Sequence, residues 1–127
     1  MIHGVGIDMI ETARVEAKIA KESGFREMVF SKSEIEYCEA KTNKYEHYAV
    51  RFAAKEAFFK ALGTGWKNGT AFNEIEIINE ESGKPEINLL GETVVTINEL
   101  TIGKISVSLS HLKDIAAAFV IVESNHD

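Results

Sequence analysis

Apolar residues recur at helical spacing along residues 46–62, and this is the clearest structural pattern in the sequence. Val50 is followed at intervals of three and four residues by the other members of one apolar stripe, Ala53, Ala54, Ala57, Phe58 and Ala61. This spacing places them on a single face of a helix. Because the stripe is rich in alanine, a neighbouring element can approach it closely. Gly63 follows directly, where glycine commonly ends a helix.

Three shorter segments have patterns typical of helices, over about residues 11–22, 31–40 and 92–100. Thr12 is a candidate cap for the first helix. Ser31 or Ser33 caps the second, and Ser33 with Glu36 has the spacing of a capping box. The short segment from Phe25 to Phe30 has no pattern that assigns it.

Five segments have the patterns of strands, over about residues 2–8, 72–78, 86–90, 104–110 and 114–123. The first strand ends on Asp8. The fourth alternates strictly, so Ile105, Val107 and Leu109 share one side. The fifth is a nearly continuous apolar run, so we expect it to be buried on both faces. Residues 111–114 between the last two strands predict a hairpin turn.

These elements predict a single α+β domain over residues 1–127, with an antiparallel sheet packed against one long helix and several shorter ones. The length suits one domain, and no linker separates the elements. The apolar content of 45% and the charged content of 27% are ordinary for a globular protein.

Composition also limits the partners and the compartment. No apolar run approaches the roughly 20 residues of a membrane span, and the N-terminus lacks the features of a signal peptide. A net charge of −6 argues against nucleic-acid binding. The one cysteine, Cys38, cannot form an internal disulfide. We therefore expect a cytoplasmic protein that binds neither membrane nor nucleic acid.

Two acids stand out as candidate metal ligands. Asp8 ends an apolar strand just before a helix, where it could equally cap the helix or be solvated. Glu56 lies on the long helix with Phe52 and Phe59 on its own face, and a partly desolvated carboxylate there requires a cation or another partner. An ion pair with Lys60, one turn away, would explain Glu56 equally well.

Basic residues and a glycine turn lie close to Glu56 in the sequence. Arg51, Lys55 and Lys60 are on the same helix, and the Gly63-Thr64-Gly65 turn follows. Glycines that flank a hydroxyl residue can present backbone N–H groups to a phosphate. The same turn could also simply end the helix. Two acids beside basic residues are what metal-assisted phosphate chemistry needs, because Mg²⁺ takes a few carboxylates together with phosphate oxygens and water.

His111, at a strand end, is either a phosphate or ribose contact or an exposed turn histidine. The sequence contains no GxSxG, Walker A, Rossmann GxGxxG or zinc-spaced Cys/His pattern.

Three segments in order resemble the signatures of one enzyme family. GVGIDMIETARVE contains Gly6, Asp8 and Arg14 at the spacing of the first signature. RFAAKEAFFKALGTG, residues 51–65, resembles the second, and SVSLSH, residues 106–111, resembles the third. The likeness spans nearly the whole chain. The sequence is similar to the holo-acyl-carrier-protein synthase type of 4′-phosphopantetheinyl transferase.

That resemblance implies the 4′-phosphopantetheinyl transferase-like fold and a reaction. The family moves phosphopantetheine from coenzyme A to a serine of apo acyl carrier protein, releases adenosine 3′,5′-bisphosphate and supports fatty acid biosynthesis. Asp8 and Glu56 would bind Mg²⁺, and Lys60 would contact the phosphate under attack, which makes these three the catalytic residues. The serine proton would go either to Glu56 or to a metal-polarised water.

The resemblance also implies contacts with the substrate and with other chains. Coenzyme A would be bound by residues of the second and third signatures, namely Arg51, Lys55, Lys60, Gly63, Thr64, Gly65 and His111. A homotrimer with active sites between subunits would complete the cleft. The acidic carrier protein would dock on the first helix, where Arg14, Lys18 and Lys21 share one face; a solvated charged face would look the same.

Two other functions would also fit these residues. A different Mg²⁺-dependent enzyme, such as a nucleotide diphosphatase, would use similar residues without a carrier protein. A non-catalytic scaffold would keep the fold alone, although two acids that converge on one cation site argue against it.

Overall fold

The computed structural model describes residues 1–125 and contains two small antiparallel sheets, five α-helices and one 3₁₀ turn within that range. The helices are α1 (Thr12–Ala20), α2 (Phe25–Val29), α3 (Lys32–Glu39), α4 (Lys44–Leu62) and α5 (Gly91–Asn98), and the 3₁₀ turn η1 is Phe72–Glu74. The strands are β1 (Ile2–Glu11), β2 (Ile75–Asn79), β3 (Pro85–Leu89), β4 (Ile102–His111) and β5 (Ile115–Ser124).

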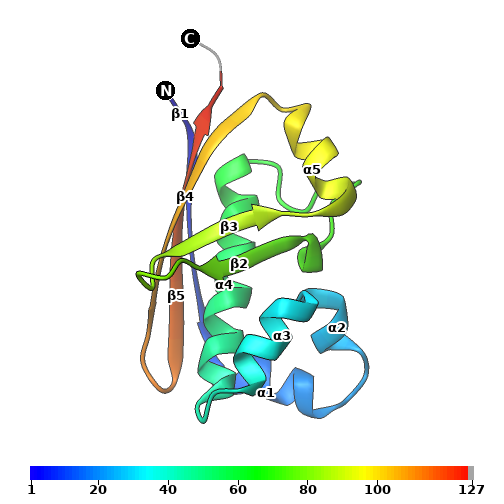
Figure 1. Cartoon of the computed structure of the whole chain (residues 1–127), viewed down its shortest axis with the longest axis vertical. Coiled ribbons are helices and arrows are strands. Elements are labelled where there is room, and N and C mark those ends of the chain that lie inside the picture. The colour runs from blue at the N-terminus through cyan, green and yellow to red at the C-terminus, as the bar shows by residue number, and fades with distance from the viewer. Residues whose placement is uncertain (126–127) are drawn as a thin grey trace.

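The long helix α4 is the central element of the molecule. The larger sheet has the order β1-β5-β4 and packs one face against α4, while β2 and β3 form the second sheet (Figure 1). The predicted α+β class with an antiparallel sheet against a long helix is confirmed. No helix within the described range is long and apolar enough to cross a membrane.

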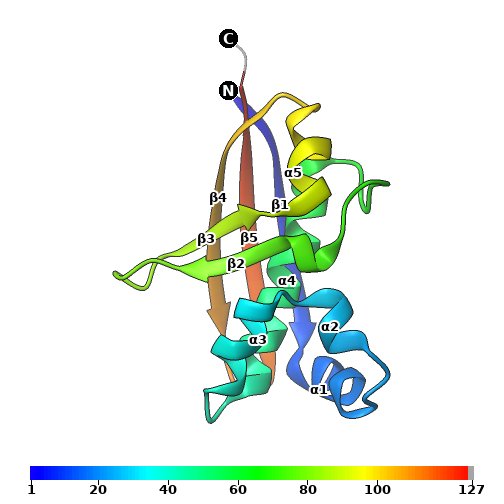
Figure 2. The ribbon, with the colours of Figure 1, turned by 45° about the vertical axis from the view of Figure 1, so that its right-hand side comes forward.

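Strand β1 lies unusually close to α4, and glycine makes this possible. A methyl group added to Gly4 would lie 2.1 Å from the carbonyl oxygen of Ala61, and one added to Gly6 would lie 2.0 Å from that of Ala57. Both distances are far below van der Waals contact. The alanines on the facing side of the helix complete this close approach, which is visible in Figure 2 where β1 runs alongside α4. The predicted alanine stripe is therefore the surface on which the sheet rests.

The core surrounds α4 on nearly all sides. All six residues of the predicted stripe are buried, and so is Phe59, which sequence had placed beside Glu56 on the opposite face. One apolar cluster joins the C-terminal half of the helix to β2, α5 and β5, and a second joins its N-terminal half to α1, α2 and α3. A helix that is enclosed in this way has no wide solvated face.

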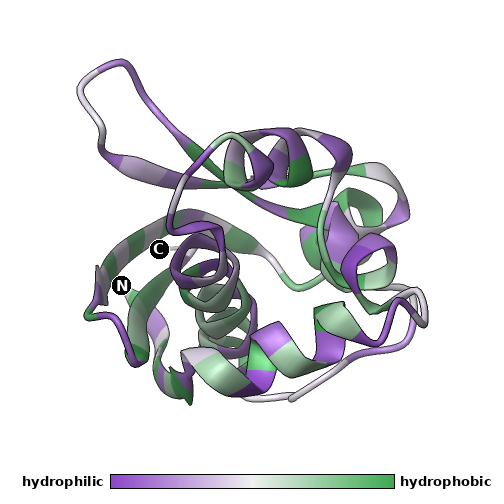
Figure 3. Ribbon diagram, turned by 90° about the horizontal axis from the view of Figure 1, so that it is seen from below, coloured by the Kyte–Doolittle hydropathy of each residue, from purple (hydrophilic) through white to green (hydrophobic). Residues whose placement is uncertain are grey.

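The far face of the larger sheet is apolar and exposed. Inward residues of β5 such as Ala118 and Val120 are buried, but Phe119 is 40% exposed. It stands in one row with Ile7 of β1 and Ser108 of β4. The other exposed apolar residues of this outer face are Val5, Met9 and Ile115. The prediction that β5 is buried on both faces is therefore wrong for the single chain. Figure 3 shows apolar and polar residues alternating along the strands beside the chain ends.

Several local predictions need correction. The capping box of α3 is formed by Ser31 and Glu34, because the helix begins two residues earlier than the Ser33–Glu36 spacing implied. Thr12 begins α1 as a helical residue instead of capping it. Strand β1 extends through Glu11, beyond the predicted end at Asp8.

Candidate active site

Asp8 lies on the inner face of β1, directed at the C-terminal half of α4. It falls in the same alternation as Gly4 and Gly6, which face the helix. The Nζ atom of Lys60 lies 2.8 Å from Oδ1 of Asp8 and 3.1 Å from the carbonyl oxygen of Ile7. The Lys60 side chain is 54% exposed and that of Asp8 is 17% exposed. The site is thus a shallow one, reached from solvent on the Lys60 side.

Glu56 joins this pair from one turn earlier on α4. Burial raises the pKa of the Glu56 carboxyl above its ordinary value, and the nearby negative charge of Asp8 raises it further. The positive charges of Lys60 and Lys18 act in the opposite direction. The structure therefore brings together the three predicted catalytic residues: two carboxylates whose charges repel, and one ammonium that partly neutralises them.

This donor set suits a magnesium ion. Within residues 1–125, no group of three or more histidine, cysteine, aspartate and glutamate side chains could hold a metal. A metal at Asp8 and Glu56 would thus have two carboxylates from this chain and free positions for water and phosphate, which is how Mg²⁺ is commonly bound. The ammonium of Lys60, in contact with Asp8, already acts as a cation at this place.

An apolar cavity of about 460 Å³ opens beside Glu56. Phe52 and Phe72 form part of its wall, and their rings are stacked with centroids 6.1 Å apart. Phe25 lies on the same cavity and carries the Lys18 ammonium 5.4 Å from its ring centroid. The predicted aromatic surroundings of Glu56 thus come from Phe52 and from residues distant in sequence.

Arg51 and His111 line a second, smaller cavity of about 200 Å³. His47 also lines it, and its ring lies 5.4 Å from that of His111. His111 contacts Glu46 through Nδ1, at 3.0 Å from Oε1. The two residues predicted to meet the nucleotide therefore share one pocket, at the N-terminal half of α4.

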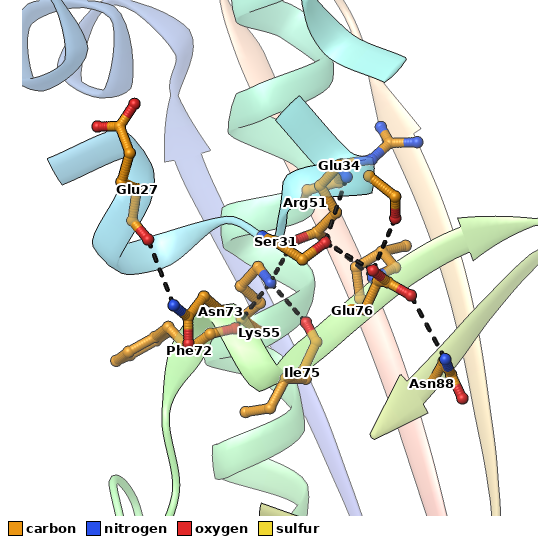
Figure 4. Close-up of polar contacts among 12 residues, drawn as sticks. Glu27, Ser31, Glu34, Arg51, Lys55, Phe72, Asn73, Ile75, Glu76 and Asn88 are labelled. Carbon is orange, nitrogen blue, oxygen red and sulfur yellow. Dashed lines mark hydrogen bonds and ion pairs between the residues drawn. The ribbon is translucent and has the colours of Figure 1, made fainter. Parts of the chain in front are cut away.

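Lys55 is not available to a ligand in this structure. Its side chain is fully buried, and Nζ lies 2.8 Å from Oε1 of Glu34 (Figure 4). The carbonyl oxygens of Phe72 and Ile75 accept its other two N–H groups. Since an ammonium has three donors, all of them are used. The prediction that Lys55 binds the cofactor is therefore not supported, and its geometry is that of a structural cation.

Glu34 is the centre of this buried network, and sequence reasoning missed it. Its Oε1 also accepts the backbone N–H of Ser31, and its Oε2 accepts that of Ile77. A hydroxyl from Ser31 reaches Glu76 on β2 (Figure 4). The network ties α3, α4 and β2 together. The available signal was a glutamate three residues after Ser31, which marks a capping box but does not reveal a partner 21 residues away.

The Gly63-Thr64-Gly65 turn lies at the other end of α4 from His111. Gly63 and Gly65 have φ angles of 82° and 62°, which glycine adopts readily. About 17 residues of helix separate Gly63 from Glu46, the partner of His111, which corresponds to about 25 Å. One chain therefore does not gather all the predicted cofactor residues into one small site.

The predicted docking residues are all exposed, two of them on α1 and Lys21 directly after its last residue. Arg14, Lys18 and Lys21 alternate with the buried residues Val15 and Ile19. Lys18 is close enough to Glu56 to influence its pKa, so this basic face borders the acidic pair.

The buried Glu34–Lys55 pair should be essential for stability. Glu34→Leu leaves an unpaired ammonium in the core, and we expect it to lower the free energy of unfolding by about 3–5 kcal/mol. Adding Lys55→Met should restore a large part of this loss, because the unpaired charge is then removed.

Urea denaturation followed by circular dichroism measures both effects. Lys44→Met, which removes an exposed partner of Glu39, is the control and should cost less than about 1 kcal/mol. A Glu34→Leu variant as stable as this control would contradict the assignment of a structural ion pair.

Comparisons with known proteins agree over nearly the whole chain. The sequence profile of the 4′-phosphopantetheinyl transferase superfamily matches residues 4–120. A holo-[acyl-carrier-protein] synthase from Cytophaga hutchinsonii is 48% identical over 128 residues, which covers 98% of this chain and 100% of the relative.

Solved structures show the same similarity. The crystal structure of holo-[acyl-carrier-protein] synthase from Neisseria meningitidis has a TM-score of 0.88 at 32% identity, covering 98% of this chain and all of that one. A synthase from Bacillus anthracis in complex with CoA (3′,5′-ADP) has a TM-score of 0.80 at 35% identity, covering 98% of both chains.

Proposed function

The chain belongs to the 4′-phosphopantetheinyl transferase superfamily and, within it, to the holo-[acyl-carrier-protein] synthases, and on this basis we propose how its residues perform the reaction. The family transfers phosphopantetheine from coenzyme A to apo acyl carrier protein. We propose that this chain does so with Mg²⁺, that it releases adenosine 3′,5′-bisphosphate, and that it supports fatty acid biosynthesis. The convergence of Asp8, Glu56 and Lys60 carries the proposal.

Asp8 and Glu56 would hold the metal through their carboxylates. When bound, Mg²⁺ would neutralise the diphosphate of coenzyme A and stabilise the charge on the leaving phosphate. Burial is the main reason that the pKa of Glu56 is raised, and the charge of Asp8 raises it further. A cation at this place would favour the charged form of the Glu56 carboxyl, which supports a role as a cation site.

Lys60 would contact the phosphate under attack. Its ammonium is exposed and already lies beside Asp8, so a phosphate at this site would come within its reach. The serine oxygen of the carrier protein forms a bond to phosphorus, and the bond to the adenosine bisphosphate oxygen breaks. The serine proton goes to Glu56 or to a polarised water, and both acceptors remain candidates.

The nucleotide end would bind at the Arg51–His111 cavity. Its histidines and buried guanidinium provide donors for phosphate and ribose oxygens. We propose that Gly63, Thr64 and Gly65 also contact coenzyme A, but from a neighbouring subunit, because about 18 Å of helix separates Gly63 from Arg51 in the cavity of the same chain.

A homotrimer would bring these parts together. The outer face of the β1-β5-β4 sheet exposes Ile7 and Phe119 in one row, next to Val5 and Met9. A contiguous exposed apolar surface of this kind commonly marks a protein interface. A second copy on this face would also bury β5 on both sides, as its nearly continuous apolar sequence predicts.

The carrier protein would dock on α1. Arg14 and Lys18 on its exposed face and Lys21 at its C-terminal end present positive charge, and Lys18 lies close enough to Glu56 to influence its pKa. An acidic partner would thus be guided toward the metal site. We place the reaction in the cytoplasm, where the free buried thiol of Cys38 would meet reducing conditions.

The direct test is conversion of apo carrier protein to its holo form with coenzyme A and Mg²⁺, measured by mass spectrometry. Asp8→Ala and Glu56→Ala should each reduce turnover by at least roughly 100-fold, because each removes a metal ligand. Circular dichroism should show an unchanged fold.

A known transferase run in parallel is the control for the substrates. No mass gain with the wild-type chain would overturn the proposed activity. Release of phosphate or of a mononucleotide without carrier protein would instead favour a diphosphatase. Near-normal turnover of either variant at limiting Mg²⁺ would overturn the metal assignment.

Docking on α1 predicts a selective defect. Arg14→Glu should raise the KM for carrier protein by roughly tenfold, because it places like charges across the interface, and should leave the KM for coenzyme A unchanged. Lys32→Glu, the same change at an exposed lysine of α3, is the matched control. Equal increases in both KM values would show that α1 is not the docking face.

Self-association predicts a change in mass. In sedimentation equilibrium the wild-type chain should have a mass three times that of the 14.1 kDa single chain. Phe119→Glu should have the mass of a single chain, because it places a charge in the apolar face. Val95→Glu, at an exposed apolar residue of α5, should not alter the mass. A wild-type monomer, or a trimeric Phe119→Glu variant, would contradict this interface.

A further inference from the structure

Arg51 is a buried cation without a buried anion. Its side chain is only 2% exposed, yet none of the ion pairs within residues 1–125 includes it. Its Nε atom is buried and makes no hydrogen bond to the described part of the chain. Burying an unpaired charge is costly, so such a residue normally has an anionic partner. On the same helix, Lys55 has one in Glu34 and Lys60 has one in Asp8.

Neutral groups hold the Arg51 guanidinium in place. Its central carbon lies 4.3 Å from the ring centroid of Tyr37, which fits a cation–π contact. Its NH2 group donates to Oδ1 of Asn79 at 2.9 Å, and NH1 donates to the carbonyl oxygen of His47 at 3.3 Å. None of these partners carries a negative charge, so they orient the guanidinium and leave its charge available.

Asn79 has a fixed orientation in this arrangement. Its Nδ2 donates to the carbonyl oxygen of Gly83 at 3.0 Å, so its oxygen is the atom that faces Arg51. Gly83 belongs to the turn between β2 and β3 and lines the same cavity as Arg51. Asn79 therefore connects the guanidinium to the wall of the pocket opposite α4.

The surroundings of Arg51 favour an anion in the cavity. The pKa of His47 is lowered by burial, and the positive charge of Arg51 lowers it further. A phosphate dianion placed there would meet a planar guanidinium that can donate two parallel hydrogen bonds. Coenzyme A carries one phosphomonoester of this kind, the 3′-phosphate of its ribose.

We infer that Tyr37 and Asn79 are positioning residues that hold Arg51 for the 3′-phosphate of coenzyme A, and that they set the preference for coenzyme A over 3′-dephospho-coenzyme A. This inference rests on the proposed contact between Arg51 and the nucleotide. Tyr37 fixes the plane of the guanidinium, and Asn79 fixes its direction without neutralising it.

The first test compares the two substrates in the transferase reaction. Tyr37→Leu and Asn79→Ala should each raise the KM for coenzyme A by roughly tenfold, with kcat unchanged and the KM for 3′-dephospho-coenzyme A unchanged. Tyr37→Phe keeps the aromatic face and should retain wild-type values. Both positions are exposed at the protein surface, which makes these variants compatible with folding.

The Asn79→Asp variant distinguishes a role of Asn79 in positioning Arg51 from a role in fold stability alone. An aspartate keeps an acceptor for Arg51 but supplies the missing negative charge, so it should raise the KM for coenzyme A at least as much as Asn79→Ala. If Asn79 only stabilised the fold, the added ion pair would leave the KM at its wild-type value. Asn98→Ala on α5 is the matched control and should change neither KM.

A binding measurement distinguishes this inference from the proposed function. Calorimetry on the protein without carrier protein should show that adenosine 3′,5′-bisphosphate binds more tightly than 5′-AMP, and that Tyr37→Leu and Asn79→Ala remove most of the difference. Equal binding of both nucleotides by the wild-type chain, or variants that weaken both equally, would overturn the inference. Either result leaves the transferase assay to decide the activity separately.

Discussion

The positions of the active-site residues are governed by the close packing of β1 on α4. Gly4 and Gly6 let the strand lie directly on helix backbone, since a side chain at either position would collide with a carbonyl oxygen. This contact fixes the register of the strand relative to the helix. Asp8, two residues after Gly6 and on the same face, is thereby delivered to Lys60 and Glu56. An apolar packing contact thus creates a polar site.

Three cations of α4 differ in the groups that neutralise them, and this difference gives each cation a different role. Lys55 is fully buried with Glu34 and links α4 to α3 and β2. Lys60 is exposed beside Asp8, where it can exchange one anion for another. Within the described range Arg51 is buried with neutral partners only, and we propose that its charge serves a ligand. Charge alone would not distinguish them.

The sequence was sufficient to predict those features of the fold that depend on local patterns of apolar and polar residues. The helix stripe from Val50 to Ala61 and the alternation of β4 predicted the α+β class and the core. The family motifs, in their expected order, predicted that Asp8 and Glu56 share one site. The sequence could not reveal that Lys55 is buried, because its partner Glu34 lies on another helix. Nor could it reveal that β5 has an exposed face, because an apolar run looks the same whether the chain itself or a second copy covers it.

The packing of β1 on α4 would deliver two carboxylates to one metal ion. Anomalous diffraction from crystals grown with Mn²⁺ and coenzyme A tests this directly. We expect one strong peak between the carboxylates of Asp8 and Glu56, in contact with the diphosphate. We also expect the Lys60 ammonium to be turned toward a phosphate. Bound coenzyme A with no peak there, or with its metal held by other residues, would contradict this assignment of the metal site.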